Sequence, residues 1–271
     1  MRVLVAEEAA FEGRPEVMQR LLDIVNEAYD FGEGDLFRDG FARATADEVL
    51  ALAAAKQLLL VVTDTAKETQ GEAQGEESKA GVEAEPKADG LEGSEETKAT
   101  AAASKPASLT AEEPPTDGDR ATFWANAVTP QSLVGCMKLV LHEPTSTPTA
   151  DAHKSKAEGE AESFSSLRIG EVGMFAVRKD LRSQGIGRLV FDAAEARARS
   201  LNCDVCELQL LYPQDRPHAV KDRLRVWYTS RGYRVVSSKD FAKAYPRVAS
   251  LINGRVCFDI YHKPLRPENS A

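Results

Sequence analysis

The sequence lacks any apolar run that would cross a lipid bilayer. Such a segment takes about 20 consecutive apolar residues, and no run in these 271 residues approaches that length. The start of the chain, MRVLVAEEAAFEG, has neither the apolar core of a signal peptide nor the Arg-rich amphipathic pattern of a transit peptide. We therefore expect an intracellular, cytoplasmic protein with no membrane partner.

Cysteine and histidine are also scarce, at four residues each. The cysteines are too few and too scattered for a disulfide framework. Cys203 and Cys206 have the spacing of a zinc-binding pair, but no second pair or neighbouring His completes a site, so we interpret them as small buried residues of a strand. The histidines stand at positions 142, 153, 218 and 262, and His218 has two interpretations, an exposed loop residue or part of a substrate site. We expect no metal.

Negative charge is in excess, with a formal net charge of −9, but the excess lies in one stretch. Residues 64–120 hold 15 acidic and 6 basic side chains, which accounts for all of it. The rest of the chain is balanced and has no basic stripe of the kind that nucleic-acid-binding proteins carry. We therefore expect no nucleic-acid partner.

Two polar stretches interrupt the pattern of apolar residues. Residues 66–120 consist almost entirely of Ala, Glu, Lys, Gly, Ser, Thr and Pro, and residues 143–166 are similarly polar. Such segments do not bury enough apolar surface to offset the entropy lost when a backbone is ordered. We therefore predict two disordered loop insertions in one domain over residues 1–263, followed by a tail at 264–271. Because closure entropy grows only logarithmically with loop length, the fold should survive their deletion.

Outside these stretches, strands alternate with helices. Apolar residues recur at helical spacing from Pro15 to Ala28, and Thr45 with Glu48 has the spacing of a capping box at the start of a second helix. The residues between them, 29–44, are predicted as a loop. This alternation indicates an α/β fold with a mixed sheet. The other predicted helices cover 185–201 and 219–230, and the predicted strands cover 2–6, 57–63, 132–142, 169–177, 204–211, 233–237 and 255–261.

The most informative segment is FAVRKDLRSQGIGRLVFDAAEARA, which predicts a strand, a short turn and a helix that begins in glycines. Glycines let the backbone approach an anion, and the first N–H groups of a helix are unpaired and lie at the positive end of its dipole. Gly185 and Gly187 form such a turn, and Arg182 and Arg188 add positive charge at its rim. The alternative is a tight turn that binds no ligand.

Two other phosphate-binding motifs are excluded at this turn. A P-loop ends in Gly-Lys-Ser or Gly-Lys-Thr, and neither sequence is present here. A dinucleotide-binding fingerprint needs a glycine three residues after Gly187, where this chain has Val190. The turn therefore favours neither a P-loop nucleotidase nor a dinucleotide oxidoreductase.

Two motifs in the last third of the chain resemble those of the GNAT superfamily of acetyl-coenzyme A-dependent N-acetyltransferases. Arg182-Ser-Gln-Gly185-Ile-Gly187 matches the family's Arg/Gln-x-x-Gly-x-Gly/Ala signature, and VWYTSRGYRVV at 226–236 is similar to its terminal aromatic element. The resemblance extends from the first helix to the last strand, without the two insertions. It implies a GNAT-like mixed, mostly antiparallel sheet that is flanked by helices and carries two disordered loop insertions.

The resemblance also implies a binding site for acetyl-CoA as cosubstrate. In the family the fourth and fifth strands splay apart, and the pantetheine arm pairs with the backbone of the fourth. Gly173 in that strand fits a bulge or a close ligand approach, with a simple lack of room for a side chain as the alternative. The implied contacts are Phe175, Ala176 and Val177 for pantetheine, and Arg182, Ser183, Gln184, Gly185, Ile186, Gly187 and Arg188 for the pyrophosphate.

Acetyl transfer to an amine needs an acid for the departing thiolate and a base for the amine. By resemblance Tyr228 is the acid, although it is also suited to pack a helix face with Leu224 and Trp227. Glu171 and Glu207 are candidates for the base, and each is equally suited to an ion pair or to solvent. This chain departs from some family members at Gly173, where they place a Glu, and it has Lys221 near the position where others have a pantetheine-binding Asn.

The function implied is direct transfer of acetyl to a primary amine in a ternary complex. The acceptor would contact the segments 29–44, 212–220 and 238–254, of which the first is rich in aromatic and acidic residues. The acidic residues of that segment either attract a cation or are simply solvated; they are Asp30, Glu33, Asp35 and Asp39. One alternative is a non-catalytic acyl-CoA-binding or interaction module. Another is a protein N-terminal or lysine acetyltransferase, which an open acceptor groove would indicate.

Overall fold

A computed structural model describes residues 1–38, 43–63, 110–116, 120–144 and 166–266. These residues belong to one compact unit, which covers 1–64 and 109–271. The two predicted insertions lie for the most part outside the described residues, as do Asp39, His153 and the end of the predicted tail.

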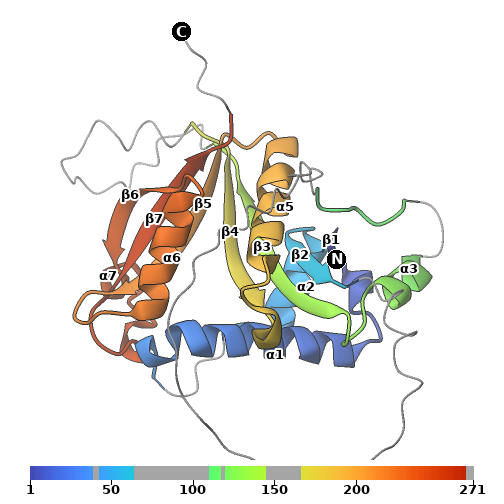
Figure 1. Ribbon diagram of the computed structural model, residues 1–271, viewed down its shortest axis with the longest axis horizontal. Helices are drawn as coiled ribbons and strands as arrows, with labels where there is room; N and C mark the ends of the chain where they lie inside the picture. The colour runs from blue at the N-terminus through green and yellow to red at the C-terminus, as the bar shows by residue number, and fades with distance from the viewer. Residues whose placement is uncertain (39–42, 64–109, 117–119, 145–165, 267–271) are drawn as a thin grey trace, which may run out of the picture. The chain divides into compact units, whose positions relative to one another are not determined.

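The described residues form a seven-stranded sheet in the order β1-β2-β3-β4-β5-β7-β6 (Figure 1). Neighbouring strands run antiparallel except β4 and β5, which are parallel. The predicted α/β class with a mixed, mostly antiparallel sheet is therefore confirmed. The strands are β1 (Arg2–Val5), β2 (Leu58–Val62), β3 (Leu133–His142), β4 (Ile169–Val177), β5 (Val205–Pro213), β6 (Arg234–Asp240) and β7 (Val256–Pro264).

Helices cover both faces of this sheet. Side chains of a strand alternate between faces, and in β2 Leu59 and Val61 pack with α5, whereas Leu58 and Leu60 pack with α1 and α2. All four are fully buried, so the continuous apolar run of β2 is explained by a core on each side. The helices are α1 (Pro15–Glu33), α2 (Ala46–Ala54), α3 (Arg120–Ala127), α5 (Ile186–Ser200), α6 (Ala219–Ser230) and α7 (Phe241–Ala244).

The first helix is longer than predicted. α1 continues to Glu33 through residues assigned to the loop 29–44. Val25, Tyr29 and Glu33 keep the i, i+4 spacing of its buried face, and this helix packs against β3 and β4. Tertiary packing thus outweighs the low helix propensity of Gly32, which had suggested a loop.

Residues 110–116 belong to the fold, although they lie inside the predicted insertion 66–120. The Glu112 N–H donates to the Val3 carbonyl, and the Val5 N–H donates to the Glu112 carbonyl, each over 2.8 Å. The isolated bridge between Leu4 and Glu112 therefore lies along the outer edge of β1. The boundary predicted at 120 was wrong, because backbone pairing does not depend on side-chain type and a polar sequence therefore does not indicate it.

Two short helices were also not predicted. α3 follows the polar stretch directly, and its Trp124 is fully buried against α1 and η1 (Glu8–Ala10). α7 turns the chain between β6 and β7. At the other end, Pro264 closes β7 and Leu265 is buried, so the fold continues beyond residue 263. The single-domain extent itself stays a prediction.

Among the described helices, none combines the length and apolar character that a membrane-spanning segment needs.

The predicted capping box is present at the start of α2. The Glu48 N–H donates to Thr45 Oγ1 over 3.3 Å, and the Thr45 N–H donates to Glu48 Oε2 over 2.9 Å. We expect Thr45→Ala to lower the free energy of unfolding by about 1 kcal/mol, because one helix N–H loses its acceptor. Urea denaturation measures this. Thr45→Ser keeps the hydroxyl and should cost much less; equal losses in the two variants would show that the cap contributes nothing.

Candidate active site

The site is centred on the place where β4 and β5 part. Their pairing runs from Ile169 opposite Val205 to Val172 opposite Leu208, whereas β4 continues to Val177. Figure 1 shows the two strands diverging beyond this point. The splay expected from the resemblance is therefore present, and the backbone edges that face the gap do not pair with each other.

A bulge in β4 accompanies the parting. Met174 has a φ of 44°, and it opposes Met137 of β3 together with Phe175 because the register shifts there. The neighbouring Gly173 lies under a side chain of β3, because a Cβ added to it would meet Cε of Lys138. That atom is near the end of a flexible side chain, so the contact alone does not require a glycine. The bulge itself lies one residue further on, at Met174.

The glycine turn that follows β4 needs its two glycines for different physical reasons. Gly185 is the N-cap of α5 with a φ of 83°, and an added Cβ would meet no atom within 4 Å. Its left-handed backbone favours glycine. At Gly187 an added Cβ would lie 3.1 Å from Cζ of Phe175, so here the requirement is space. The first N–H groups of α5, which have no partner within the helix, thus remain accessible at the turn.

Arg182 is held at the end of β4 with part of its guanidinium unused. Its Nε donates to the Val177 carbonyl over 3.1 Å, and its guanidinium carbon lies 4.9 Å from the ring centroid of Phe31. Its Nη2 is buried and has no hydrogen-bond partner among the described residues. A buried donor without a partner is costly, so this position fits an anionic ligand.

A pocket of about 460 Å³ opens beside the turn, between α1 and α6. Its walls combine apolar side chains, such as Phe31 and Trp227, with the cations Arg182, Arg188 and Arg223. The residues predicted to bind the cosubstrate that line it are Phe175, Val177, Arg182, Ser183, Gly185, Gly187 and Arg188.

Three other predicted contacts have different surroundings. Ala176 is buried in the core beneath α1, and Ile186 is buried in the core beneath α5. Gln184 donates from Nε2 to the Asp180 carbonyl over 3.2 Å. Any part that Ala176 and Ile186 take in binding would come from their backbone, whereas Gln184 is exposed at the turn.

A second pocket, of about 100 Å³, adjoins the first between β4 and β5. The two share Ala28, Gly32, Phe175 and Leu224 in their walls. We call it the inner pocket. Its lining includes Val172 and Leu208, the last paired residues of the two strands, and Tyr228 of α6. Tyr228 therefore stands at the end of the space that begins at the glycine turn.

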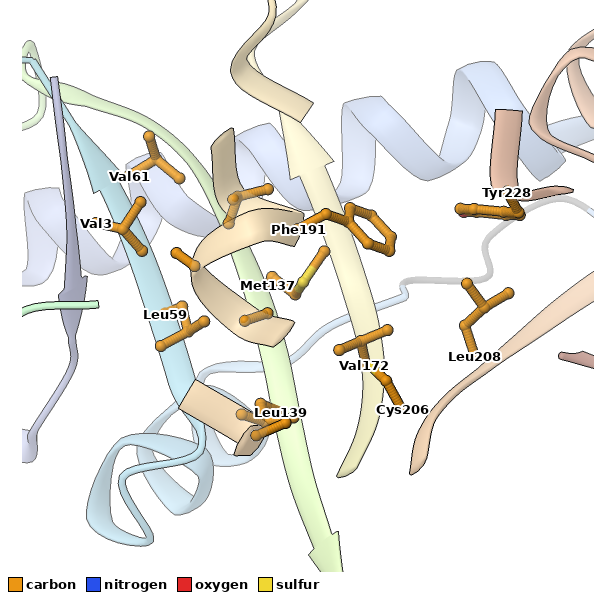
Figure 2. Close-up of a cluster of buried hydrophobic side chains, with 14 of the residues drawn as sticks. Val3, Leu59, Val61, Met137, Leu139, Val172, Phe191, Cys206, Leu208 and Tyr228 are labelled. Atoms are coloured by element: carbon orange, nitrogen blue, oxygen red, sulfur yellow. The ribbon is translucent and has the colours of Figure 1, made fainter. Parts of the chain in front are cut away.

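Tyr228 packs in the core and also lines the inner pocket, and its role as the acid stays a prediction. Its ring centroid lies 5.8 Å from that of Phe191 and 6.0 Å from that of Tyr261. Figure 2 shows Phe191 directed across β4 toward Tyr228, with Leu208 nearby. Burial raises the pKa of Tyr228 above its ordinary value, and the charge of Glu33 raises it further.

Glu171 is engaged in ion pairs. Its Oε1 lies 2.8 Å from Nζ of Lys138 and its Oε2 lies 3.0 Å from Nε2 of His142. It stands opposite Glu207 in the parallel register of β4 and β5.

Glu207 is likewise paired, with its Oε2 2.8 Å from Nε2 of His262. Burial alone would raise the pKa of Glu207, but hydrogen bonds from His262 and Gln209 outweigh it and lower that pKa. The structure thus brings the two predicted candidates for the base together, but neither lines the inner pocket. The role of base stays a prediction for both.

The inner pocket has a charged pair that sequence reasoning did not connect. Glu33, at the end of α1, accepts a hydrogen bond from Nζ of Lys221 in α6 over 2.7 Å, and their side chains are 10% and 2% exposed. Desolvation lowers the pKa of Lys221, although Glu33 opposes this effect. The signal for Glu33 was the i, i+4 spacing after Val25 and Tyr29, which continues the buried face of α1.

The acceptor segments predicted from the sequence are joined to each other. The Asn253 N–H donates to the Leu36 carbonyl and the Arg38 N–H to the Leu251 carbonyl, each over 2.8 Å. Phe37 and Ile252 form an isolated bridge between these bonds. The segment after α1 and the segment before β7 thus lie side by side through backbone pairing.

His218 is part of this junction. It is buried, its Nε2 lies 3.0 Å from Oδ1 of Asp35, and its Nδ1 accepts from the Lys221 N–H at the start of α6. Asp35 therefore has partners in the protein rather than only solvent.

Cys203 and Cys206 are the cysteines with the spacing of a zinc-binding pair. Both thiols are buried, and burial raises the pKa of Cys206 to about 12. Within the described ranges, no three His, Cys, Asp or Glu side chains gather in an arrangement that would hold a metal ion.

A family model described as "Acetyltransferase (GNAT) family" matches residues 94–220. In the described part of that range stand α3, β3, β4, the glycine turn, α5, β5 and the start of α6. No curated protein matches the sequence.

Several solved structures are similar to part of the chain. NAA60 from Arabidopsis thaliana, in complex with a bisubstrate analogue, is 15% identical over 50% of this chain and 67% of its own, with a TM-score of 0.34. Naa20 from Chaetomium thermophilum is 18% identical over 49% of this chain and 60% of its own, also with a TM-score of 0.34. A putative streptothricin acetyltransferase from Bacillus anthracis, in complex with acetyl coenzyme A, is 13% identical over 49% of this chain and 56% of its own, with a TM-score of 0.32.

This chain thus spans between 56% and 67% of the length of those three proteins. The family match carries the assignment, because its range contains the signature turn and both of the strands that part. The resemblance read from the sequence is thereby confirmed as a match to the GNAT family of acetyltransferases over residues 94–220.

Proposed function

We propose that this protein is an N-acetyltransferase that moves the acetyl group of acetyl-CoA directly to a primary amine in a ternary complex. The observation that carries the proposal is the unpartnered Nη2 of Arg182. It lies at a glycine turn, beside a pocket that adjoins the gap between β4 and β5. A diphosphate with a long thiol-bearing arm suits such an arrangement.

The residues present fit the diphosphate, pantetheine and acetyl parts of acetyl-CoA. The N–H groups at the start of α5 would hold the diphosphate, with Arg182, Arg188 and Arg223 supplying positive charge. The unpaired edge of β4 at 175–177 would accept the pantetheine amides as an added strand does. The inner pocket of about 100 Å³ has room for a small acyl group such as acetyl.

The chemistry follows from holding both reactants in this space. A neutral amine attacks the thioester carbonyl carbon, a C–N bond forms, and the C–S bond breaks. Bringing the two together removes much of the entropic cost of the reaction. Tyr228 protonates the departing thiolate, and its raised pKa keeps the phenol protonated at neutral pH. Glu171 and Glu207 are proposed as bases on the basis of the family resemblance.

The joined acceptor segments support a narrow acceptor. The backbone pairing at Phe37 and Ile252 joins two of the predicted acceptor segments, between which an open groove for a protein acceptor would have to lie. We therefore favour a small amine or the free end of a chain over a lysine within a folded surface. The non-catalytic acyl-CoA-binding module is the second candidate. It is less favoured because Tyr228, the proposed acid, is present in the wall of the inner pocket.

The cosubstrate site is tested by two variants of Gly185 that differ only in charge. Asn and Asp are similar in size, and both tolerate left-handed backbone better than most residues. Because a Cβ here meets no atom within 4 Å, both should fold. We expect Gly185→Asp to weaken acetyl-CoA binding by about 100-fold through repulsion of the diphosphate, and Gly185→Asn to weaken it far less. Isothermal titration measures both.

Equal affinity in the two variants would place the diphosphate elsewhere. A wild-type protein that binds no acetyl-CoA would end the proposal and leave an interaction module.

Tyr228→Phe should reduce kcat by about 100-fold, because a general acid is lost, without changing the affinity for acetyl-CoA. Burial raises the pKa of Tyr228, so the phenol stays protonated well into the alkaline range. Stopped-time assays with a panel of primary amines from pH 6 to 10 measure this. We expect that deprotonation of Tyr228 causes no decline of the wild-type rate across that range.

An alkaline decline that disappears in Tyr228→Phe would show that the phenol loses its proton within that range, whereas a Tyr228→Phe variant with the wild-type rate would contradict the assignment of Tyr228 as the acid. If the wild type binds acetyl-CoA but acetylates no amine of the panel, the non-catalytic module becomes the better account.

A further inference from the structure

The carboxylate of Glu33 has one oxygen that the protein does not use. Oε1 accepts from Lys221, whereas Oε2 is buried and has no hydrogen-bond partner among the described residues. Glu33 is 8% exposed and lines the inner pocket together with Tyr228. Leaving a buried carboxylate oxygen without a donor is costly, so a ligand that donates hydrogen bonds fits this place.

Helix geometry adds a second argument. Glu33 is the last residue of α1, where a negative charge opposes the helix dipole, and Lys221 lies in the first turn of α6, where a positive charge opposes it. Neither residue stabilises its own helix. Each charge is instead placed at the favourable end of the other helix, so the start of α6 faces the carboxylate of Glu33 beside the pocket.

Stability alone does not account for the pair. A buried ion pair is often no better for stability than apolar residues of the same volume, because both charges lose their hydration. Glu171 and Glu207 differ from Glu33. Both oxygens of Glu171 contact a Lys or His side chain, Oε2 of Glu207 contacts a His side chain, and neither residue lines the inner pocket. Glu33 is the carboxylate with a free oxygen at the place where the thioester would lie.

We infer that Glu33 receives the ammonium group of the acceptor and takes its first proton, with Lys221 as the residue that positions the carboxylate. The inference rests on the proposed N-acetyltransferase function and names the acceptor as a cation before reaction. It adds a third carboxylate to the two proposed as base.

In the proposed reaction the acceptor nitrogen loses two protons. Glu33 accepts one proton from R–NH3⁺, and the neutral nitrogen attacks the carbonyl carbon of acetyl-CoA. The C–N bond forms, the C–S bond breaks, and the Tyr228 O–H protonates the thiolate. The second proton lost by nitrogen restores the phenol, and the proton on Glu33 passes to solvent. The products are the acetamide, the thiol of CoA and one proton.

Several charged or titratable groups surround Glu33 and bear on its pH dependence. They come from α1, from the residues before α2, from η2 (Gly34–Leu36) and from α6. Interactions link Glu33 to Tyr29, Arg43, Lys221 and Tyr228, and link Lys221 in turn to Asp35. The guanidinium carbon of Arg43 lies 4.7 Å from the ring centroid of Tyr29. Lys221, by contrast, is in direct contact with the carboxylate of Glu33.

Binding tests the inference without turnover. The full chain is saturated with CoA, which has no acetyl group to give, and titrated calorimetrically with hexylamine and with its neutral counterpart hexan-1-ol. We expect hexylamine to bind more tightly than the alcohol. Glu33→Gln should weaken hexylamine binding by about tenfold or more, because a charged hydrogen bond is lost, and should leave hexan-1-ol unaffected.

Glu27→Gln is the matched control. Glu27 is exposed on the same helix and loses the same charge, so this variant should bind hexylamine as the wild type does. Equal hexylamine affinity in wild type and Glu33→Gln, or no hexylamine binding to the wild-type CoA complex, overturns the inference. The proposed function is judged separately by acetyl-CoA binding, which Glu33→Gln should leave unchanged.

Rates against pH separate catalysis from structural support. With hexylamine as acceptor, Glu33→Gln should lower kcat/KM by about 100-fold and remove the acid limb of its pH profile. Lys221→Met should keep the maximum rate but move the acid limb to higher pH, because a buried carboxylate without its cation is harder to ionise.

The double variant Glu33→Gln/Lys221→Met leaves no unpaired charge, which guards against loss of folding. It should stay as inactive as Glu33→Gln. Recovery of activity in the double variant would show a purely structural pair, and an acid limb that vanishes instead in Glu171→Gln or Glu207→Gln would assign the base to that residue.

Discussion

The end of pairing between β4 and β5 is the constraint on which the site depends. Beyond Val172 and Leu208 the two strands no longer exchange hydrogen bonds, which leaves backbone groups facing a gap that must be satisfied by something else. The bulge at Met174 and the glycine turn at 185–187 both follow from this parting, since β4 bends away and the chain must reverse into α5 within a few residues. The inner pocket exists because this gap is lined by side chains but not closed by them.

The charges of the site lie at the ends of helices rather than within strands. Three helix ends converge on the two adjoining pockets, namely the end of α1 with Glu33 and the starts of α5 and α6. The start of α5 provides N–H groups for an anion, and the start of α6 supports a carboxylate. In the proposed reaction the same arrangement would hold a negative diphosphate at one end and a positive ammonium at the other.

Local patterns predicted most of the fold and one half of the site. Gly185, Gly187 and Arg182 were identifiable because their chemistry is encoded within six consecutive residues, and the capping box of Thr45 and Glu48 is equally local. Glu33 was assigned to a loop whose acidic residues either attract a cation or are solvated, and Lys221 was noted only as a departure from the family. Their contact joins residues 188 positions apart, and no periodicity within either helix indicates the other helix. The pairing of Glu112 with β1 escaped prediction for the same reason, because backbone bonds between distant segments do not depend on side-chain type.

That pairing protects an edge. β1 is the first strand of the sheet, and its outer N–H and C=O groups would otherwise be open to strands of other molecules. Val3 and Val5 exchange backbone hydrogen bonds with Glu112, whereas the opposite edge strand, β6, carries exposed Arg234, Lys239 and Asp240. A shortened chain cut at the boundaries suggested by composition would keep its core but uncover β1. Self-association through that edge, rather than loss of the fold, would then limit its use, and a shortened chain should therefore retain residues 110–116.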